Sequence, residues 1–328
     1  MKVLVTGGSG FLGSHIVEKL VADGHDVACL VRKTSNTKHL GSLGVELREG
    51  AVDAPETLTK AVEGVDAIVH CAGLVKAKTY DDFERVHSGG TVALADAALK
   101  HAKGLQRFVH VSTAGVMGAG KKGEKHLESG EPSPATPYSK SKLAGERALL
   151  ERKGELPITV IRPPAIYGPR DNEILAFFQM VRRTRMAFRM GGSMKSMSLV
   201  FGPDCADACV RAMTRDLPSG STYFVDDGYT YTYEDMAHAI AAAYGIGLWG
   251  APSLPVPIVT AAAFGSEMFG RLTNRAVIFK RDKLPELLME HFVVDSSAAR
   301  RDLGWQPTVA FAEGAKLTAA WYRENRWD

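Results

Sequence analysis

A phenol and an ammonium group lie four residues apart in the segment 136–146, which reads TPYSKSKLAGE. Thr136 and Pro137 are typical of a helix N-cap and a first helical position, so Tyr138 and Lys142 are predicted to share one face of the helix that follows. A free tyrosine has a pKa of about 10, but an ammonium about 4 Å away favours the phenolate by roughly 4 kcal/mol at an effective dielectric of 20. The pair therefore predicts a tyrosine that exchanges its proton near neutral pH. The alternative is a surface helix with solvated lysines.

A glycine-rich segment near the start of the chain has the spacing of a dinucleotide-binding turn. Residues 6–13 read TGGSGFLG, between an apolar run at 2–6 and a helical pattern. Residues without a Cβ allow a pyrophosphate to approach the backbone N–H groups of a helix N-terminus. The segment therefore predicts dinucleotide binding rather than a merely structural turn. The contacts are expected at Gly7, Gly10, Phe11, Leu12 and Gly13.

The residue that ends the second predicted strand distinguishes two cofactors. An acidic side chain there would bind the ribose hydroxyls of NAD. This chain has Arg32 and Lys33 instead, and no acid between Asp26 and Glu46. A guanidinium suits a 2′-phosphate, so Arg32 favours NADP over NAD. The alternative is that both cations belong to a solvated loop.

The elements that must position these residues alternate along the chain. Apolar runs of strand length occur at 2–6, 26–32, 45–49, 66–73, 107–113 and 158–163, separated by amphipathic stretches. Apolar strands alternating with helices predict an α/β fold with a doubly wound parallel sheet, the Rossmann fold. We expect residues 1–165 to form the NAD(P)-binding domain, its sheet completed by a strand near 222–227. Residues 166–328 are expected to form a smaller, partly interwoven substrate-binding domain.

Composition excludes several classes of function. The 328 residues carry a net charge of only +3, so no nucleic-acid partner is expected. Of the four cysteines, Cys29 and Cys71 lie inside apolar runs, and Cys205 and Cys209 have no neighbouring ligands, which predicts free thiols in a reducing compartment and no metal. The chain opens without a signal-peptide pattern, and the apolar region 248–269 is broken by three prolines. We therefore expect a cytoplasmic protein whose membrane contact is absent or at most peripheral.

At this point the chain resembles the extended short-chain dehydrogenase/reductases, also called the NAD-dependent epimerase/dehydratase superfamily. The resemblance covers nearly the whole chain and is closest in character to hydroxysteroid dehydrogenases and dihydroflavonol reductase-like members. It rests on TGGSGFLG, HCAG (70–73), VHVSTAGVMG (109–118), the Tyr138–Lys142 spacing, IRPPAIYGPRDN (161–172) and DLGWQP (302–307).

The resemblance implies a role for each matching residue. Thr113 would hydrogen-bond the reacting oxygen, with Ser112 a weaker candidate. Tyr138 would be the acid/base, and Lys142 would hold the nicotinamide ribose and lower the tyrosine pKa. Further cofactor contacts are implied at Val52, Ala72 and Gly73. A homodimer is implied through the helices near 81–102 and 137–153.

Departures from the family pattern narrow the range of reactions and substrates expected for this chain. His87 replaces an asparagine that helps to organise the site, either as a hydrogen-bonding group or as a structural histidine. Ala165 and Met197 stand where sugar-nucleotide enzymes carry an asparagine and an arginine. Ala114 and Gly115 replace the Asp-Glu pair of the 4,6-dehydratases. Sugar nucleotides are therefore disfavoured as substrates.

The preferred hypothesis is an NAD(P)-dependent reductase or dehydrogenase. It would move a hydride between nicotinamide and the carbonyl or carbinol carbon of a relatively apolar substrate, such as a steroid-like compound, a flavonoid-like ketone or a β-keto acid. The alternatives are a nucleoside-diphosphate-sugar epimerase with bound NAD and a non-catalytic dinucleotide sensor. An apolar substrate pocket is expected to be lined by five methionines, Met117, Met186, Met190, Met194 and Met197.

Overall fold

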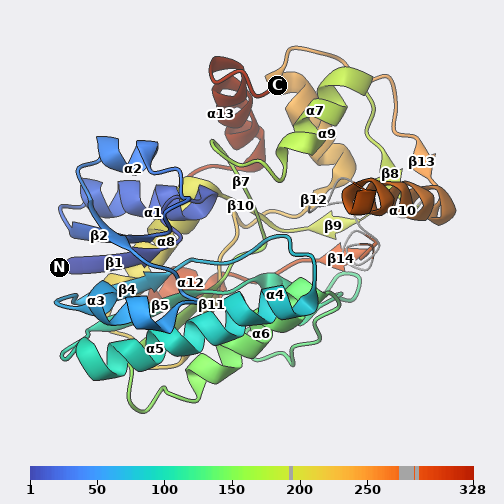
Figure 1. Ribbon diagram of the computed structural model, residues 1–328. Helices are drawn as coiled ribbons and strands as arrows, with labels where there is room; N and C mark the ends of the chain where they lie inside the picture. Colours follow the sequence, from blue (N-terminus) through green and yellow to red (C-terminus); the bar gives the residue numbers. More distant parts are fainter. Residues whose placement is uncertain (192–194, 273–283, 285–287) are drawn as a thin grey trace.

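The centre of the computed structural model is a seven-stranded parallel sheet, in the order β11-β6-β5-β4-β1-β2-β3 (Figure 1). The structure describes residues 1–191, 195–272, 284 and 288–328. Most residues of these strands are apolar and buried, as expected for a sheet covered on both faces. The strands are β1 (Lys2–Thr6), β2 (Asp26–Val31), β3 (Glu46–Glu49), β4 (Ala67–His70), β5 (Arg107–Val111), β6 (Ile158–Arg162) and β11 (Ser221–Phe224).

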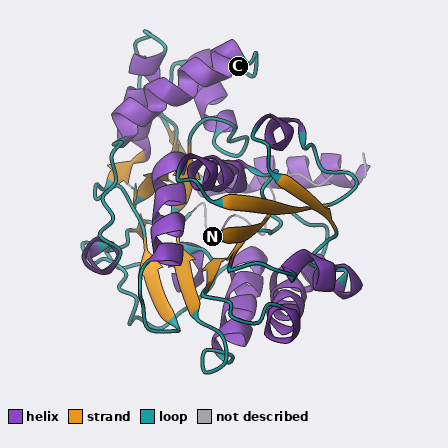
Figure 2. Cartoon of the chain, turned by 90° about the vertical axis from the view of Figure 1, so that its left-hand side faces the viewer, coloured by secondary structure: helices purple, strands orange, loops and turns teal. Residues whose placement is uncertain are grey.

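Helices cover the sheet on both faces, so the fold is the predicted doubly wound Rossmann type (Figures 1 and 2). One face is covered by α1 (Phe11–Ala22), α8 (Gly202–Thr214) and α12 (Ser297–Asp302), and the other by α3 (Leu58–Val62), α5 (Gly90–His101) and α6 (Pro137–Leu150). Two short helices complete this part, α2 (Lys38–Ser42) and α4 (Tyr80–Glu84).

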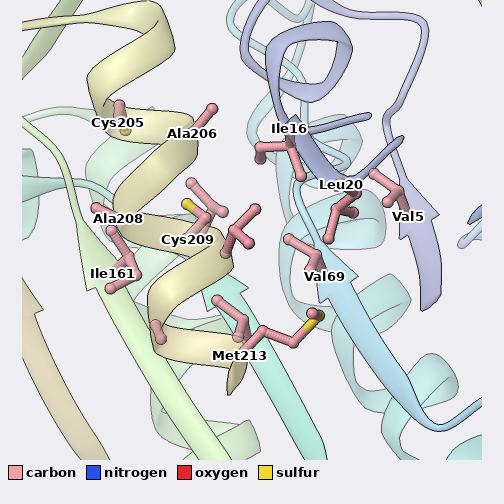
Figure 3. Packing of buried hydrophobic residues seen from close by; sticks show 14 of the residues in the cluster. Val5, Ile16, Leu20, Val69, Ile161, Cys205, Ala206, Ala208, Cys209 and Met213 are labelled. Atoms are coloured by element: carbon pink, nitrogen blue, oxygen red, sulfur yellow. The ribbon is translucent and has the colours of Figure 1, made fainter. Parts of the chain in front are cut away.

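Helix α8 shows how the second half of the chain returns to the first. Its small side chains, among them Ala206 and Cys209, pack in one cluster with Ile16 and Leu20 of α1 (Figure 3). Each fully buried Ile or Leu contributes about 1.5–3 kcal/mol to folding. Because β11 also pairs with β6, residues from beyond 165 complete both the sheet and its cover.

The remaining elements form a smaller region at one end of the molecule (Figure 1). Its helices are α7 (Leu175–Thr184), α9 (Tyr233–Ala243), α10 (Val256–Leu272) and α13 (Phe311–Glu324). Its short strands pair as β7 (Ala165–Tyr167) with β10 (Leu199–Phe201), β8 (Arg189–Met190) with β13 (Ser253–Leu254), and β9 (Ser196–Met197) with both β12 (Tyr231–Thr232) and β14 (His291–Phe292). Among the described residues, none of the helices has the length and apolar character needed to cross a bilayer.

Two helices differ from the sequence prediction. The helix expected over 81–102 is divided by a π-helical turn, Arg85–Gly89, between α4 and α5. The two adjacent glycines, Gly89 and Gly90, lie at the junction, where helix propensity is low. The sequence pattern also predicts a helix near 171–184, but α7 begins only at Leu175, because the Asp171 carboxylate accepts hydrogen bonds from the N–H groups of Glu173 and Ile174 and holds a turn there.

Candidate active site

The cleft lies where the strand order reverses. β1 is flanked by β2 on one side and β4 on the other, so the connections leave the carboxyl ends of β1 and β4 in opposite directions. Such a switch point leaves a crevice at the carboxyl edge of a parallel sheet. A cavity of about 1060 Å³ occupies it. The cavity is lined by all of the predicted site residues, Gly7, Gly10, Phe11, Leu12, Gly13, Arg32, Val52, Ala72, Gly73, Thr113, Tyr138 and Lys142.

The glycine turn between β1 and α1 is shaped for an anion. Gly7 has φ +75°, and a Cβ on Gly13 would lie 2.0 Å from the Gly7 carbonyl oxygen, so neither position accepts a larger residue without movement. No side chain caps the N-terminus of α1, and its first turn contains no acid. The first N–H groups of the helix therefore face the cavity with the positive end of the helix dipole, which suits the pyrophosphate of a dinucleotide.

Helix α6 begins as its sequence predicts. The Thr136 hydroxyl accepts a hydrogen bond from the Ser139 N–H, at 3.2 Å, and Pro137 occupies the first turn. This places the half-buried Tyr138 in the first turn of the helix, with its ring edge-on to Phe83 and to His87 at centroid distances of 6.0 and 5.5 Å. The two aromatic contacts restrict the orientation of the phenol.

Lys142 makes a contact that the sequence did not predict. Its Nζ donates a hydrogen bond to the backbone carbonyl of Val111, the last residue of β5, at 2.6 Å. The side chain is only 6% exposed. Burial lowers the pKa of Lys142 to about 8, although Cys71 and Glu146 oppose the change. The amine is therefore anchored at the carboxyl edge of the sheet.

Thr113 follows β5 and opens a short helical turn, Ala114–Met117. Its Oγ1 accepts a hydrogen bond from the Gly115 N–H at 3.1 Å, which leaves the hydroxyl proton available for another acceptor. The neighbouring Ser112 also lines the cavity, and among the described residues its buried Oγ has no hydrogen-bond partner. Two hydroxyl donors thus lie at one strand end.

His87 links three segments of the cavity wall, a role that the sequence left open. Its Nε2 accepts a hydrogen bond from the Leu74 N–H at 2.9 Å, so its proton is assigned to Nδ1, which lies 2.8 Å from Ser141 Oγ. Ser141 Oγ in turn donates to the Tyr138 carbonyl. Burial, with a smaller effect of Lys142, lowers the pKa of His87 to about 3. The histidine is therefore neutral and couples the loop after β4 to the Tyr138 helix.

A second buried histidine fixes the ends of β1 and β4. Thr91 Oγ1 donates to the His87 carbonyl, so it accepts from His70 Nε2, at 2.9 Å. His70 Nδ1 then accepts from Thr6 Oγ1, at 2.7 Å, and that oxygen accepts from the Ala72 N–H. This network was missed because its members lie in four separate elements. The only sequence signal is four hydroxyl or imidazole groups among apolar runs.

At the other end of the cavity, Arg32 and Lys33 have different surroundings. Arg32 is exposed and lines the cavity, whereas Lys33 lies 3.4 Å from Glu49 and is outside it. Polar and basic side chains from the loop after β2 and from α2 continue the lining beyond Arg32, namely Ser35, Asn36, Lys38 and His39. This end of the cavity therefore favours a negatively charged group.

Two of the methionines predicted to line a substrate pocket pack in different cores. Met117 is 3% exposed and packs in a small core with Val116 and Leu143, and Met197 packs against the core of the second region. Neither lines the cavity. Met194 lies outside the described residues, as does the side chain of Met190. Within the described part of the chain, no cluster of side chains could hold a metal ion.

Comparisons with known proteins agree with this architecture. The sequence model of the NAD dependent epimerase/dehydratase family matches residues 3–225. The chain is 32% identical over 330 residues to a ceramide reductase of Caulobacter vibrioides, covering 99% of this chain and 95% of the relative. It is 31% identical over 345 residues to a UDP-glucose 4-epimerase of Mycolicibacterium smegmatis, covering 99% of each.

A solved structure supports the fold alone. The UDP-glucose 4-epimerase of Thermotoga maritima, solved with UDP-glucose, matches with a TM-score of 0.81 at 22% identity, over 99% of this chain and all of that one. Because a reductase and epimerases are all similar to this chain, similarity by itself does not separate the two reactions.

Proposed function

The chain belongs to the NAD-dependent epimerase/dehydratase family, and we propose that it is an NADP-dependent reductase of a relatively apolar ketone. The observation that carries the proposal is that one cavity contains the glycine turn, Arg32 and the Thr113, Tyr138 and Lys142 side chains. A dinucleotide site and an acid/base set in the same cleft are what hydride transfer to a carbonyl needs.

The chain's own groups supply the proton chemistry. When bound, the nicotinamide would supply the hydride that reaches the carbonyl carbon. Thr113 donates a hydrogen bond to the carbonyl oxygen, and Tyr138 donates the proton that this oxygen takes up as the C=O bond becomes an alcohol. Lys142, held by the Val111 carbonyl, supplies the positive charge that favours the phenolate left on Tyr138.

NADP is the proposed cofactor because of the charge at the adenosine end. Arg32 and Lys38 line that end, and the residues lining it between 30 and 42 include no acid. A 2′-phosphate would find a guanidinium able to pair with two of its oxygens.

Two observations favour a ketone over a sugar nucleotide. Met197 packs into the core of the second region, and Ala165 has no polar side chain to offer. Neither side chain can donate a hydrogen bond or provide a positive charge to the diphosphate of a sugar nucleotide. Similarity to a ceramide reductase supports a long-chain or otherwise apolar substrate. Epimerisation of a nucleoside-diphosphate sugar stays the second candidate, because the similarity to a UDP-glucose 4-epimerase is nearly as high.

The test is NADPH oxidation with a panel of steroid-like, flavonoid-like, β-keto acid and long-chain lipid ketones. Tyr138→Phe should lower kcat by about 10²–10⁴-fold with NADPH affinity retained. Tyr80→Phe is the matched control, since Tyr80 is 41% exposed and outside the cavity. Full activity of Tyr138→Phe would exclude the mechanism. Purified protein that carries NAD and converts UDP-glucose without net redox change would establish the epimerase instead.

A further inference from the structure

Helix α10 turns an apolar face to the solvent. Between residues 256 and 268, every residue that is exposed is apolar, whereas the polar Thr260, Ser266 and Glu267 are half-buried. Ile258 is 55% exposed and Met268 is 39% exposed. A surface helix of a globular protein normally shows the reverse pattern.

The exposed apolar residues are contiguous along the helix. Ile258, Ala261, Gly265 and Met268 follow a spacing of three and four, which is one stripe of an α-helix. Phe264, 47% exposed, borders this stripe. The opposite side of α10 is buried in the protein through residues such as Val259, at 2%. The stripe is therefore an outer surface, and contiguous exposed apolar surface of this kind marks an interaction site.

The segment that precedes α10 carries a further exposed apolar residue with positive charge beside it. Trp249 is 74% exposed, and the guanidinium of Arg185 lies over its ring, 5.5 Å from the centroid. The backbone N–H of Trp249 donates to the backbone carbonyl of Arg185 at 2.8 Å. The carbonyl of Ala251, two residues after Trp249, accepts a hydrogen bond from Arg189 Nε at 3.1 Å. The arginines thus border the apolar residues directly.

These arginines are not accounted for by the active site. Neither Arg185 nor Arg189 lines the cofactor cavity. The segment 182–189 contains four arginines and no acid. Figure 1 places α10, β8 and β13 together at one edge of the molecule, away from the central sheet.

We propose that this surface, made of Trp249, the exposed stripe of α10 and the bordering Arg185 and Arg189, docks on the interface of an anionic phospholipid bilayer. The helix would lie in the plane of the interface, with its apolar stripe at the level of the acyl chains. Tryptophan favours that interface, and arginines pair with lipid phosphates. The proposal does not depend on which reaction the active site performs.

Charge distinguishes this occupant from a second copy of the chain. In a two-fold dimer the surface meets its own copy, so the Arg185 and Arg189 of both copies would share one interface, and the residues that define this surface include no acid to pair with them. Like charges brought together in this way oppose association. An anionic lipid surface provides the complementary charge instead.

The experiment is sedimentation of the full chain with two kinds of vesicle, phosphatidylcholine mixed with phosphatidylglycerol and phosphatidylcholine alone. We expect the chain to sediment with the mixed vesicles and to be released by salt. Ile258→Glu combined with Met268→Glu should weaken this binding by at least about tenfold. The control is Leu317→Glu, which places one of the two added negative charges at a 44% exposed apolar position on α13, away from this surface.

A second pair of variants tests the electrostatic part separately. Arg185→Gln combined with Arg189→Gln should abolish the preference for phosphatidylglycerol. The proposal is overturned if the unmodified chain does not bind the mixed vesicles, or if the glutamate pair binds as well as the Leu317→Glu control. It is also overturned if the glutamate pair converts a dimer to a monomer and leaves vesicle binding unchanged, because the surface is then a contact between copies.

Discussion

Replacing Lys142 by methionine should stabilise the cofactor-free fold at neutral pH while removing its activity. The amine is 6% exposed, and burial lowers its pKa from 10.5 to about 8. One pKa unit corresponds to about 1.4 kcal/mol, so a charged Lys142 costs the folded state about 3 kcal/mol. The proton is bound more weakly in the folded chain than in the unfolded one. The cost is therefore fully present below about pH 8 and disappears as the pH rises toward the unfolded pKa near 10.5.

Methionine has a similar length and no charge, so it removes this cost. It also removes the hydrogen bond to the Val111 carbonyl, and an unsatisfied buried acceptor costs about 1–3 kcal/mol. The net gain at neutral pH is therefore small, of the order of 1 kcal/mol. The pH dependence is the sharper quantity, because the lost hydrogen bond enters at every pH. Between about pH 6.5 and about pH 9.5, the stability advantage of Lys142→Met over the unmodified chain should fall by about 2 kcal/mol.

The measurement is urea-induced unfolding of the cofactor-free protein at those two pH values. Lys140→Met is the matched control, since Lys140 is an exposed lysine on the same helix. Because Lys140 is exposed, burial of its amine does not contribute to its difference from the unmodified chain. If the unfolding free energies of Lys142→Met and the unmodified chain run parallel in pH, Lys142 does not carry a strongly lowered pKa and the burial cost worked out above is wrong.

Three further changes test other parts of the structure. Gly13→Ala should weaken NADPH binding by at least roughly tenfold, because the new Cβ would lie 2.0 Å from the Gly7 carbonyl oxygen. Fluorescence titration measures the NADPH affinity, and an unchanged affinity would contradict the close approach of the two glycines. Glu146→Gln should lower the unfolding free energy by about 3–5 kcal/mol, since it breaks a buried ion pair with Arg162, and replacing both partners by methionine should cost less. Arg32→Gln should raise KM for NADPH by roughly tenfold or more and leave KM for NADH nearly unchanged. Equal changes in the two KM values would show that Arg32 does not select the cofactor.

Most of the central sheet could be predicted from the sequence because its signals are local. The run at 107–113, for example, becomes β5 (Arg107–Val111), and the expected strand near 222–227 becomes β11 (Ser221–Phe224) beside β6. The π-helical turn at Arg85–Gly89 could not be predicted, because the apolar spacing of 81–102 fits a continuous helix equally well. The pairing of β8 with β13 depends on residues about sixty apart, and neither short strand has a periodic pattern of its own.

Among the site residues, too, those with a local sequence signal could be predicted and those without one could not. The spacing of Gly7 to Gly13 and of Tyr138 to Lys142 lies within single segments, so the sequence identifies residues that the fold then brings into one cavity. The hydrogen bond from Lys142 to the end of β5 joins residues 31 apart in sequence, and no local pattern indicates it. The sequence favoured Arg32 over Lys33 only through the chemistry of the guanidinium. The ion pair of Lys33 with Glu49, which lies outside the cavity that Arg32 lines, could not be predicted from it.

The buried histidines explain how the cavity can be rigid without adding charge beside Tyr138. Burial lowers the pKa of both His70 and His87 to about 3, so neither ring is protonated near neutral pH. Each ring instead joins two partners, a donor on one nitrogen and an acceptor on the other. A protonated His87 would lose its bond from the Leu74 N–H and would place a second cation near Lys142, which would lower the lysine pKa further. Neutral histidines therefore hold the cavity wall in place without adding a positive charge beside Lys142.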